Sequence, residues 1–387
     1  MPTYGDRTMT FVRGEGAYLF DADGRRFLDF GGGIAVTSIG HSHPVMVKAL
    51  QEQAAKVLHT SNLYLIPGQI RAAERLCANS FADVVFFGNS GAEANEGLIK
   101  LVRKYHAHHG HPERYRMITI EGAFHGRTLA TIAAGGNQKH LEGFGPPVEG
   151  FDQVPFGNMN ALRAAITKET AGVLIEPIQG EGGIRPMDLE YMREVRKVCD
   201  EFGILMAVDE VQCGIGRTGK LFAYQWSGIE PDVLSSAKGL GGGVPVGAVL
   251  ATKKAAVGMV AGTHGSTYGG NPLSTAAVNT VLDVVLADGF MDHVQEISAY
   301  LREKSEELVA KHPGILKSVR GAGLMLGFVA GPPNGSVVAA AAENGLLLVP
   351  AGDNVVRMLP PLTIGRAEVD EAIAILDKTA AAMAAAS

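Results

Sequence analysis

The stretch Ile204-Leu205-Met206-Ala207-Val208, followed at once by Asp209-Glu210-Val211-Gln212, indicates most directly how this chain folds. Its apolar residues do not alternate with polar ones, so we expect both faces of the segment to be buried. Similar short apolar runs, separated by helical stretches, lie at Val84–Phe87, Met117–Ile120, Gly172–Ile175, Val233–Ser235 and Ala248–Leu250. Together these runs predict an α/β fold, in which helices cover a buried and mostly parallel sheet.

The two ends of the chain show a different pattern. Near the N-terminus, strand-like pieces at Ala17–Asp21 and Arg26–Asp29 precede a Gly31-Gly32-Gly33 bend and a helix from about Pro44 to Leu58. After residue 290, a long helical stretch is followed by strand candidates and a closing Ala-rich helix; the candidates are Leu324–Val329, Leu346–Val349 and Val355–Leu359. We therefore expect a segment 1–60 that packs with a small α+β domain, 291–387, and a large domain, 61–290.

Composition excludes several classes of protein. Of the 387 residues, 46% are hydrophobic and 19% charged, which is typical of a soluble globular protein. A net charge of −6 provides no basic surface for nucleic acid or for an anionic membrane. Cys77, Cys199 and Cys213 are an odd number and widely spaced, with no Cys-x-x-Cys pair, which argues against a disulfide framework and a zinc ribbon. No apolar run is long enough for a membrane span or a secretory signal, so we expect a cytoplasmic protein.

Chemically useful residues follow the predicted strands, where ligands of open α/β sheets bind. After Phe87, the small residues Ser90, Gly91 and Ala92 open a helix, and their backbone N–H groups could hold a phosphate. An ordinary helix cap with a glycine bend would explain the same residues. Asp209, at the end of its strand, could be a metal ligand, a helix cap or the partner of a cation.

Lys238 follows the strand predicted at Val233–Ser235 and lies between small residues, in Ser235-Ser236-Ala237-Lys238-Gly239. Burial there would lower the pKa of the ammonium group, as a lysine that forms a Schiff base requires. The alternative is a surface lysine whose stem lies along a loop. A phosphate cradle, an acid and a buried lysine, each after a strand, together predict a site for pyridoxal phosphate.

Six stretches extend this pattern to nearly the whole chain, from Gly14 to Arg357. They are Gly40–Pro44, Asn89–Glu96, Phe124–Thr128, Glu176–Gly183, the segment around Lys238, and Thr267–Pro272. On these motifs the chain resembles the class III pyridoxal-phosphate-dependent aminotransferases, and within that class it is most similar to the acetylornithine branch. The resemblance implies fold type I, the aspartate aminotransferase-like fold, and a homodimer.

The resemblance also implies roles toward the cofactor. Lys238 would carry the aldehyde carbon as a Schiff base and then move a proton between the substrate and cofactor C4′. Asp209 would pair with the pyridinium nitrogen, and Gln212 would bond the phenolic oxygen. Phe124, otherwise an ordinary core aromatic, would stack on the ring. Thr267 would reach the phosphate held by the partner subunit, while Ser90, Gly91 and Ala92 hold it from within.

Substrate roles come from the same resemblance. Arg127 would bind one substrate carboxylate and Arg357 a second, although both could otherwise be solvated surface charges. Glu181 would pair with Arg357 when the substrate has no second carboxylate. Ile34 replaces the tyrosine of ornithine δ-aminotransferases, which favours an N-acylated donor. Tyr18 is a further pocket candidate, or simply a strand aromatic.

The expected reaction converts N-acetylornithine and 2-oxoglutarate to N-acetylglutamate 5-semialdehyde and glutamate, as in arginine biosynthesis. Alternatives are transamination of N-succinylornithine, ornithine, 4-aminobutyrate or another ω-amine, a pyridoxal phosphate aminomutase, and a non-catalytic binding protein. We expect no metal: the histidines between 106 and 111 and the pair His41/His43 lack acidic or cysteine ligands nearby. Gly321-Ala322-Gly323 is not followed by a helix, as a dinucleotide loop would be.

Overall fold

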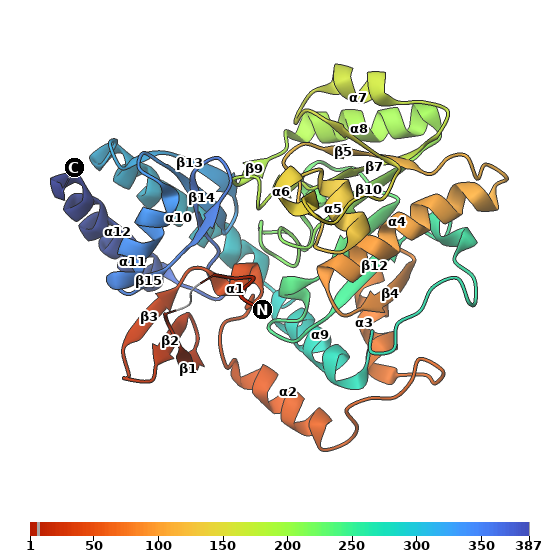
Figure 1. Cartoon of the computed structure of the whole chain (residues 1–387). Coiled ribbons are helices and arrows are strands. Elements are labelled where there is room, and N and C mark those ends of the chain that lie inside the picture. Colours follow the sequence, from red (N-terminus) through yellow and green to blue (C-terminus); the bar gives the residue numbers. More distant parts are fainter. Residues whose placement is uncertain (6–7, 387) are drawn as a thin grey trace.

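The structure is a computed structural model, and it describes residues 1–5 and 8–386. Figure 1 shows a large α/β part beside a smaller part that contains the C-terminal helices and the N-terminal strands. The large sheet has the strand order β4-β12-β11-β10-β7-β5-β6. Its strands are β4 (Val84–Gly88), β12 (Gly247–Ala251), β11 (Val233–Ser236), β10 (Leu205–Asp209), β7 (Thr170–Ile175), β5 (Arg116–Ile120) and β6 (Phe151–Val154).

The mostly parallel sheet is confirmed, and each of the six predicted runs contributes one strand to it. Only β12 runs antiparallel to its neighbours, β11 and β4. Strand β10 lies in the middle, parallel to both β7 and β11, and all five of its residues are buried. The absence of alternation at 204–208 thus has its physical cause in helices covering both faces.

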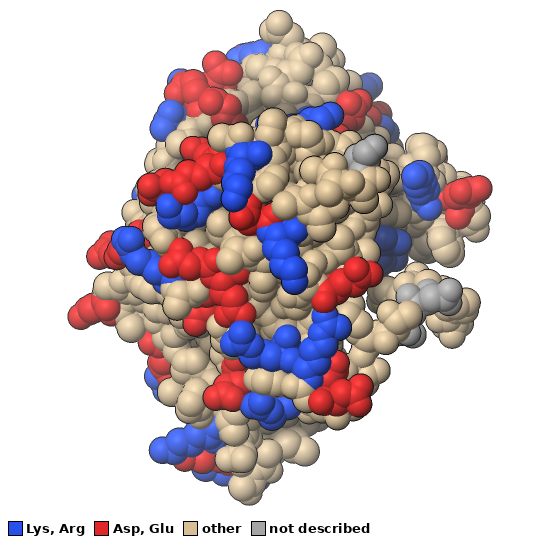
Figure 2. All heavy atoms as spheres, turned by 90° about the vertical axis from the view of Figure 1, so that its left-hand side faces the viewer, with Lys and Arg blue, Asp and Glu red and all other residues tan. Residues whose placement is uncertain are grey.

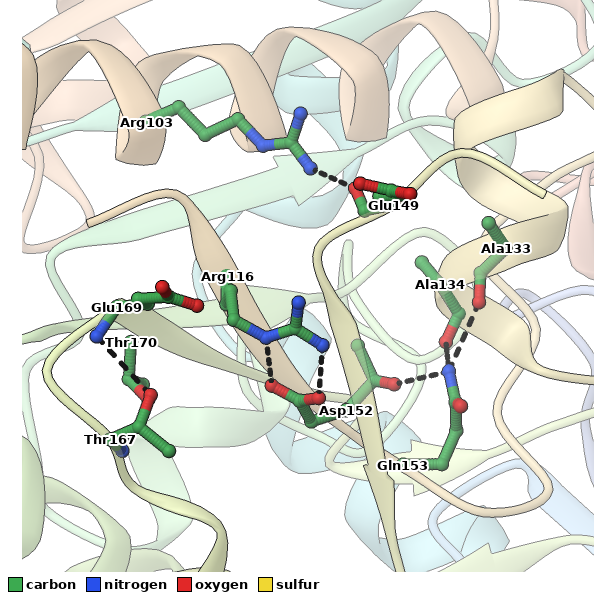
Figure 3. Close-up of polar contacts among 11 residues, drawn as sticks. Arg103, Arg116, Ala133, Ala134, Glu149, Asp152, Gln153, Thr167, Glu169 and Thr170 are labelled. Carbon is green, nitrogen blue, oxygen red and sulfur yellow. Dashed lines mark hydrogen bonds and ion pairs between the residues drawn. The ribbon is translucent and has the colours of Figure 1, made fainter. Parts of the chain in front are cut away.

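Strand β6 was missed, because its sequence Phe151-Asp152-Gln153-Val154 mixes polar and apolar residues at the sheet edge. Its polar side chains bond to neighbouring elements (Figure 3). Asp152 forms a bidentate ion pair with Arg116 of β5: Nε lies 2.9 Å from Oδ2 and Nη2 lies 2.5 Å from Oδ1. Gln153 donates to the carbonyl of Ala133 at 3.0 Å and to that of Ala134.

Helices surround this sheet. They are α3 (Pro67–Ala78), α4 (Gly91–His108), α5 (Leu129–Gly135), α6 (Gln138–Leu141), α7 (Met159–Ala165), α8 (Leu189–Phe202) and α9 (Pro272–Val285). Short elements complete the region: the hairpin β8 (Ile178–Gln179) and β9 (Arg185–Pro186), and the 3-10 turns η1 (Ala223–Trp226), η2 (Lys238–Leu240) and η3 (Ala255–Gly258). Helix α4 begins at Gly91, soon after β4 ends at Gly88, so its N-terminus lies at the carboxyl end of β4, and the helix packs on β11 and β12.

The C-terminal part has its own antiparallel sheet, β13-β14-β17-β16. Its elements are α10 (Phe290–Lys311), β13 (Leu316–Ala322), β14 (Met325–Ala330), α11 (Asn334–Glu343), β15 (Leu346–Leu347), β16 (Val349–Ala351), β17 (Val355–Met358) and α12 (Arg366–Ala386). On the face shown in Figure 2, basic and acidic side chains are interspersed. Ion pairs such as Lys311–Asp377, at 2.8 Å, join α10 to α12.

The N-terminal strands β1 (Phe11–Glu15), β2 (Tyr18–Asp21) and β3 (Arg26–Asp29) form a second small sheet with β15. They are followed by the turn α1 (Gly32–Ala35) and helix α2 (Pro44–Ala54), which ends before the predicted Leu58. The single strand predicted at Leu346–Val349 is wrong. Leu346 pairs with β3 whereas Val349 pairs with β17, because the chain changes sheets between them. The division into domains at residues 60 and 290 stays a prediction.

Within the described ranges 1–5 and 8–386, no one helix has the length and apolar character to cross a membrane. Helices α9 and α10 pass that test only when taken together, and they are bent by 72° at their junction. Ten of the fourteen residues of α9 are buried in the protein.

Candidate active site

A cavity of about 260 Å³ lies at the carboxyl ends of β4, β5, β7, β10 and β11. The residues that follow these parallel strands meet at one edge of the sheet, as expected for an open α/β fold. The lining residues are Gly91, Ala92, Asn95, Phe124, His125, Gly126, Arg127, Glu176, Asp209, Val211, Gln212 and Lys238.

Helix α4 presents its N-terminus to this cavity. Ser90 caps the helix, since its Oγ accepts a hydrogen bond from the backbone N–H of Glu93 at 3.1 Å. Gly91 and Ala92 form the first turn, whose N–H groups have no partner inside the helix. A Cβ on Gly91 would lie 2.7 Å from Val211 Cγ1, so the close approach of this turn to the Asp209 loop requires glycine. The cap and the anion site are therefore compatible interpretations of the same residues.

Asp209 lies in the floor of the cavity, 3% exposed, and is held by three donors. Its Oδ2 accepts from Asn95 Nδ2 at 2.7 Å and from His125 Nδ1 at 2.8 Å, and its Oδ1 accepts from the backbone N–H of Val211 at 3.0 Å. Burial would lower the pKa of His125, but the hydrogen bond to Asp209 and its negative charge outweigh burial and raise it. A buried carboxylate with this support is suited to stabilise a cation above it.

Residues beneath Asp209 were missed by sequence reasoning. Asn95 is fixed by Ser235, whose Oγ donates to Asn95 Oδ1 at 2.7 Å, and Asn95 Nδ2 also donates to the carbonyl of His125 at 2.8 Å. Glu176 is buried nearby and accepts from the backbone N–H of Phe124 at 3.0 Å; burial raises its pKa to about 8. One signal was available: Asn95 lies four residues after Gly91 and so on the same face of α4.

Lys238 begins the turn η2 with φ 46°, in the left-handed region that non-glycine residues seldom adopt. Such a backbone costs on the order of 1–3 kcal/mol and persists only where packing imposes it. Here Ser38 donates to the carbonyl of Gly239 at 2.8 Å and holds the turn. Burial lowers the pKa of Lys238, and the negative charges of Glu181 and Asp209 offset this only in part. The lysine thus lines the cavity and does not extend along a surface loop.

An ion pair between the buried Arg357 and the more exposed Glu181, called the fork below, lies beside the cavity. Arg357 Nη1 lies 2.7 Å from Glu181 Oε1, and Nη2 lies 3.2 Å from Glu181 Oε2. Arg357 also donates to Gln212 Oε1 at 3.1 Å and to the carbonyl of Pro350 at 3.1 Å. Its side chain is 1% exposed and that of Glu181 is 34% exposed. Arg357 is therefore no solvated surface charge, and its carboxylate partner is the accessible member of the pair.

Arg127 and Phe124 form the outer wall. The guanidinium carbon of Arg127 lies 5.6 Å from the centre of the Phe124 ring. No hydrogen bond or ion pair holds Arg127 in the part of the chain that the structure describes. Arg127 is exposed in the single chain, and an unpaired guanidinium in a cavity wall is available for a ligand carboxylate.

Six predicted site residues are not among those that line this cavity: Ser90, Glu181 and Arg357, which lie beside it, and Tyr18, Ile34 and Thr267. The hydroxyl of Tyr18 donates to Glu371 Oε2 of α12 at 3.0 Å, and burial raises the pKa of Tyr18 to about 12. Ile34, with φ 66°, is 39% exposed. Thr267 is exposed in the turn before α9. Tyr18, Ile34 and Thr267 do not line the cavity that contains Lys238 in the described part of the chain, so their roles stay predictions.

The residues that line the cavity fit pyridoxal phosphate. A helix N-terminus suits its phosphate, Asp209 suits a pyridinium nitrogen, and Lys238 offers an amine of lowered pKa. The histidine cluster offers no rival site: His106 Nε2 bonds the carbonyl of Ala171 at 2.8 Å. Across residues 1–5 and 8–386, no group of three or more potential ligands is arranged to hold a metal ion.

Residues 2–380 match the family described as Aminotransferase class-III. The chain belongs to this family, and it is an aminotransferase of the pyridoxal-phosphate-dependent kind. An acetylornithine aminotransferase from Mesorhizobium japonicum is 58% identical over 371 residues, which cover 96% of this chain and 93% of that protein.

Solved structures agree with this assignment. An N-acetylornithine aminotransferase from Stenotrophomonas maltophilia has 37% identity and a TM-score of 0.87, with 100% of this chain and 99% of that chain covered. An ornithine aminotransferase from Toxoplasma gondii, described with partial occupancy of pyridoxal phosphate at its active site, has 30% identity and a TM-score of 0.93, with 98% and 92% covered. The predicted type I fold is thereby confirmed.

Proposed function

We propose that the chain transfers the terminal amine of N-acetylornithine to 2-oxoglutarate. The observation that carries this proposal is the fork between Glu181 and Arg357 beside Lys238. A donor with one carboxylate leaves the fork closed and uses Arg127. A dicarboxylate such as 2-oxoglutarate or glutamate displaces Glu181, and its second carboxylate then takes Arg357. One cavity can in this way serve both half-reactions.

In this proposal the chain's own groups hold pyridoxal phosphate. Ser90, Gly91 and Ala92 bind the phosphate, Asp209 the ring nitrogen, Gln212 the phenolic oxygen, and Phe124 covers one face of the ring. When bound, the cofactor supplies an electron sink for the pair left behind when the proton leaves the amine-bearing carbon. The Lys238 amine takes that proton and returns it, and its lowered pKa favours the uncharged form that a base needs.

The choice of an N-acylated donor is supported by Ile34 and by the relatives. A tyrosine at position 34 would offer a hydroxyl to a free α-amine, whereas isoleucine offers only an apolar surface. Curated relatives at 55–58% identity are named acetylornithine aminotransferases. Free ornithine is the other candidate, because ornithine aminotransferases have the same fold.

The site is completed by a second copy of the chain, with Thr267 reaching the partner's phosphate. Large apolar side chains near this turn support that expectation, because Leu63 and Leu65 are each 87% exposed and Tyr268 is 61% exposed. Such exposure is unusual for a surface that faces only water.

Release of glutamate from 2-oxoglutarate, measured with a panel of amine donors, tests the function. We expect kcat/KM for N-acetylornithine to exceed that for ornithine by about 100-fold, the size of effect that one mismatched polar contact can have. Lys238→Ala should abolish turnover and the visible absorbance of the loaded enzyme. Equal use of both donors would overturn the acyl preference, and turnover by the Lys238→Ala enzyme would overturn the site.

A further inference from the structure

Gln212 contacts the fork and also lines the cavity that contains Lys238. It lies in the loop after β10 and is 7% exposed. Its Oε1 accepts a hydrogen bond from Arg357 Nη1 at 3.1 Å, between residues 145 positions apart. Because Arg357 comes from β17, this hydrogen bond joins the C-terminal part of the chain to the loop after β10. The side chain of Gln212 is thus held by a distant element.

The chemistry of Arg357 determines which end of the Gln212 amide faces it. A guanidinium carries only donors, whereas an amide has an accepting oxygen and a donating NH2 group. The oxygen of the amide must therefore face Arg357, and the NH2 group is left for another partner. In the part of the chain that the structure describes, no group accepts a hydrogen bond from Gln212 Nε2. The amide therefore offers an unused donor to a ligand in the cavity.

The guanidinium of Arg357 is itself fixed in place. Its Nη1 also lies 2.7 Å from Glu181 Oε1, and its Nη2 donates to the carbonyl of Pro350 at 3.1 Å. Next to Glu181 in the sequence, Gly180 packs directly against the Gln212 amide, because a Cβ at Gly180 would overlap both Oε1 and Nε2 of that amide. These contacts leave the amide little room to rotate, so its free donor is preorganised.

We propose that Arg357 is a positioning residue for Gln212, and that it turns the amide so that the NH2 group donates to the phenolic oxygen of bound pyridoxal phosphate. This inference rests on the proposed function, in which Gln212 bonds that oxygen. A donor that is held in advance stabilises the negative charge of the oxygen more than a donor that must first turn around. The guanidinium that receives a second substrate carboxylate in the proposed function then also sets a contact to the cofactor.

The test compares the binding of two compounds to the full-length chain: pyridoxal phosphate and its 3-deoxy analogue, which lacks the phenolic hydroxyl. Fluorescence titration without any amine donor gives a dissociation constant for each, and the ratio of the two isolates the contact to the phenolic oxygen. We expect Gln212→Ala to lower the preference for pyridoxal phosphate by about tenfold relative to the wild type, the effect of one hydrogen bond to a charged group. Arg357→Met should lower the preference by about threefold or more, because the amide is then free to turn.

Three further variants separate positioning from a general effect. In the Gln212→Ala background, Arg357→Met should lower the preference no further, because the arginine acts through the amide. Glu181→Gln retains the guanidinium and its hydrogen bond to Gln212, so the preference should stay within about twofold of the wild type. Arg163→Met, which removes an exposed ion pair with Glu201, is the matched control for the substitution itself and should change neither dissociation constant.

Equal weakening of both compounds by Arg357→Met would overturn the inference, since it would mean that the arginine only supports the fold. Unchanged binding of both compounds in that variant would overturn it as well. An unchanged preference in Gln212→Ala would contradict the contact that the proposed function gives to Gln212, and the inference would fall with it. Failure of the proposed reaction is distinct, because it is measured as glutamate release, whereas these titrations contain no amine donor.

Discussion

In the proposed function the choice of substrate depends on Arg357, because a substrate carboxylate displaces its partner Glu181. Arg357 is buried and charged, and removing a partner from a buried charge costs several kcal/mol unless another anion replaces it. Glu181 supplies the anion from a more exposed position. In the proposed function the pair therefore has two states, in which the carboxylate of Glu181 and a carboxylate of the substrate compete for one guanidinium.

Glu181→Gln should shift that competition toward dicarboxylates. The amide keeps the shape of the side chain but removes its charge, so glutamate and 2-oxoglutarate meet an unpaired Arg357. We expect the ratio of kcat/KM for N-acetylornithine to kcat/KM for glutamate to fall by about tenfold, measured in separate half-reactions. Glu190→Gln, which breaks an exposed pair with Arg193, is the matched control. An unchanged ratio in Glu181→Gln would contradict the competition.

At the scale of elements, the start of α4 does two things at once. Ser90 caps the helix by accepting a hydrogen bond from the backbone N–H of Glu93, and the first turn, which lines the cavity, has N–H groups without partners inside the helix. Gly91 permits this because Val211, in the loop after β10, packs directly on it. The position of the candidate anion site thus depends on the contact between the residues that follow β4 and those that follow β10.

Gly91→Ala should weaken binding of pyridoxal phosphate by about tenfold, because the added Cβ forces α4 and the Asp209 loop apart. Fluorescence titration of the cofactor-free protein measures this. Gly335→Ala is the matched control, since a Cβ at this exposed position of α11 meets nothing within 4 Å. There the substitution should leave cofactor affinity unchanged. Equal affinity in both variants would show that the close approach is not needed.

At the scale of the whole molecule, Arg217 joins the two parts of the chain. It is 2% exposed and donates to the carbonyls of Leu324, at 3.2 Å, and of Pro360. Its own carbonyl accepts from the N–H of Leu324 at 2.9 Å. Burial lowers the pKa of Arg217 to about 9, so the guanidinium stays charged at neutral pH. Carbonyl oxygens alone solvate this charge among the described residues.

Arg217→Ala should destabilise the loaded enzyme by about 2–4 kcal/mol, because two buried carbonyls lose their donor and a cavity remains. Calorimetric melting should show a clear decrease in Tm. Arg163→Ala, at an exposed ion pair, should lower stability by less than about 1 kcal/mol. If the two variants melted alike, Arg217 would not contribute to holding the two parts together.

The sequence by itself determined the α/β class, the six buried strands and the local chemistry of Ser90, Asp209 and Lys238. These depend on patterns within a few residues, because burial on both faces removes alternation and small residues mark a turn. The family motifs extended the same reasoning to Arg127, Glu181 and Arg357. No pattern of neighbouring residues identified the edge strand β6, because its polar side chains are paired with other elements.

Only the tertiary structure decided which side chains meet across the sheet. The support of Asp209 by Asn95 and His125 joins residues more than 80 positions apart, and the fork joins Glu181 to Arg357 across 176 positions. The break at Leu348 depends on two sheets competing for one segment.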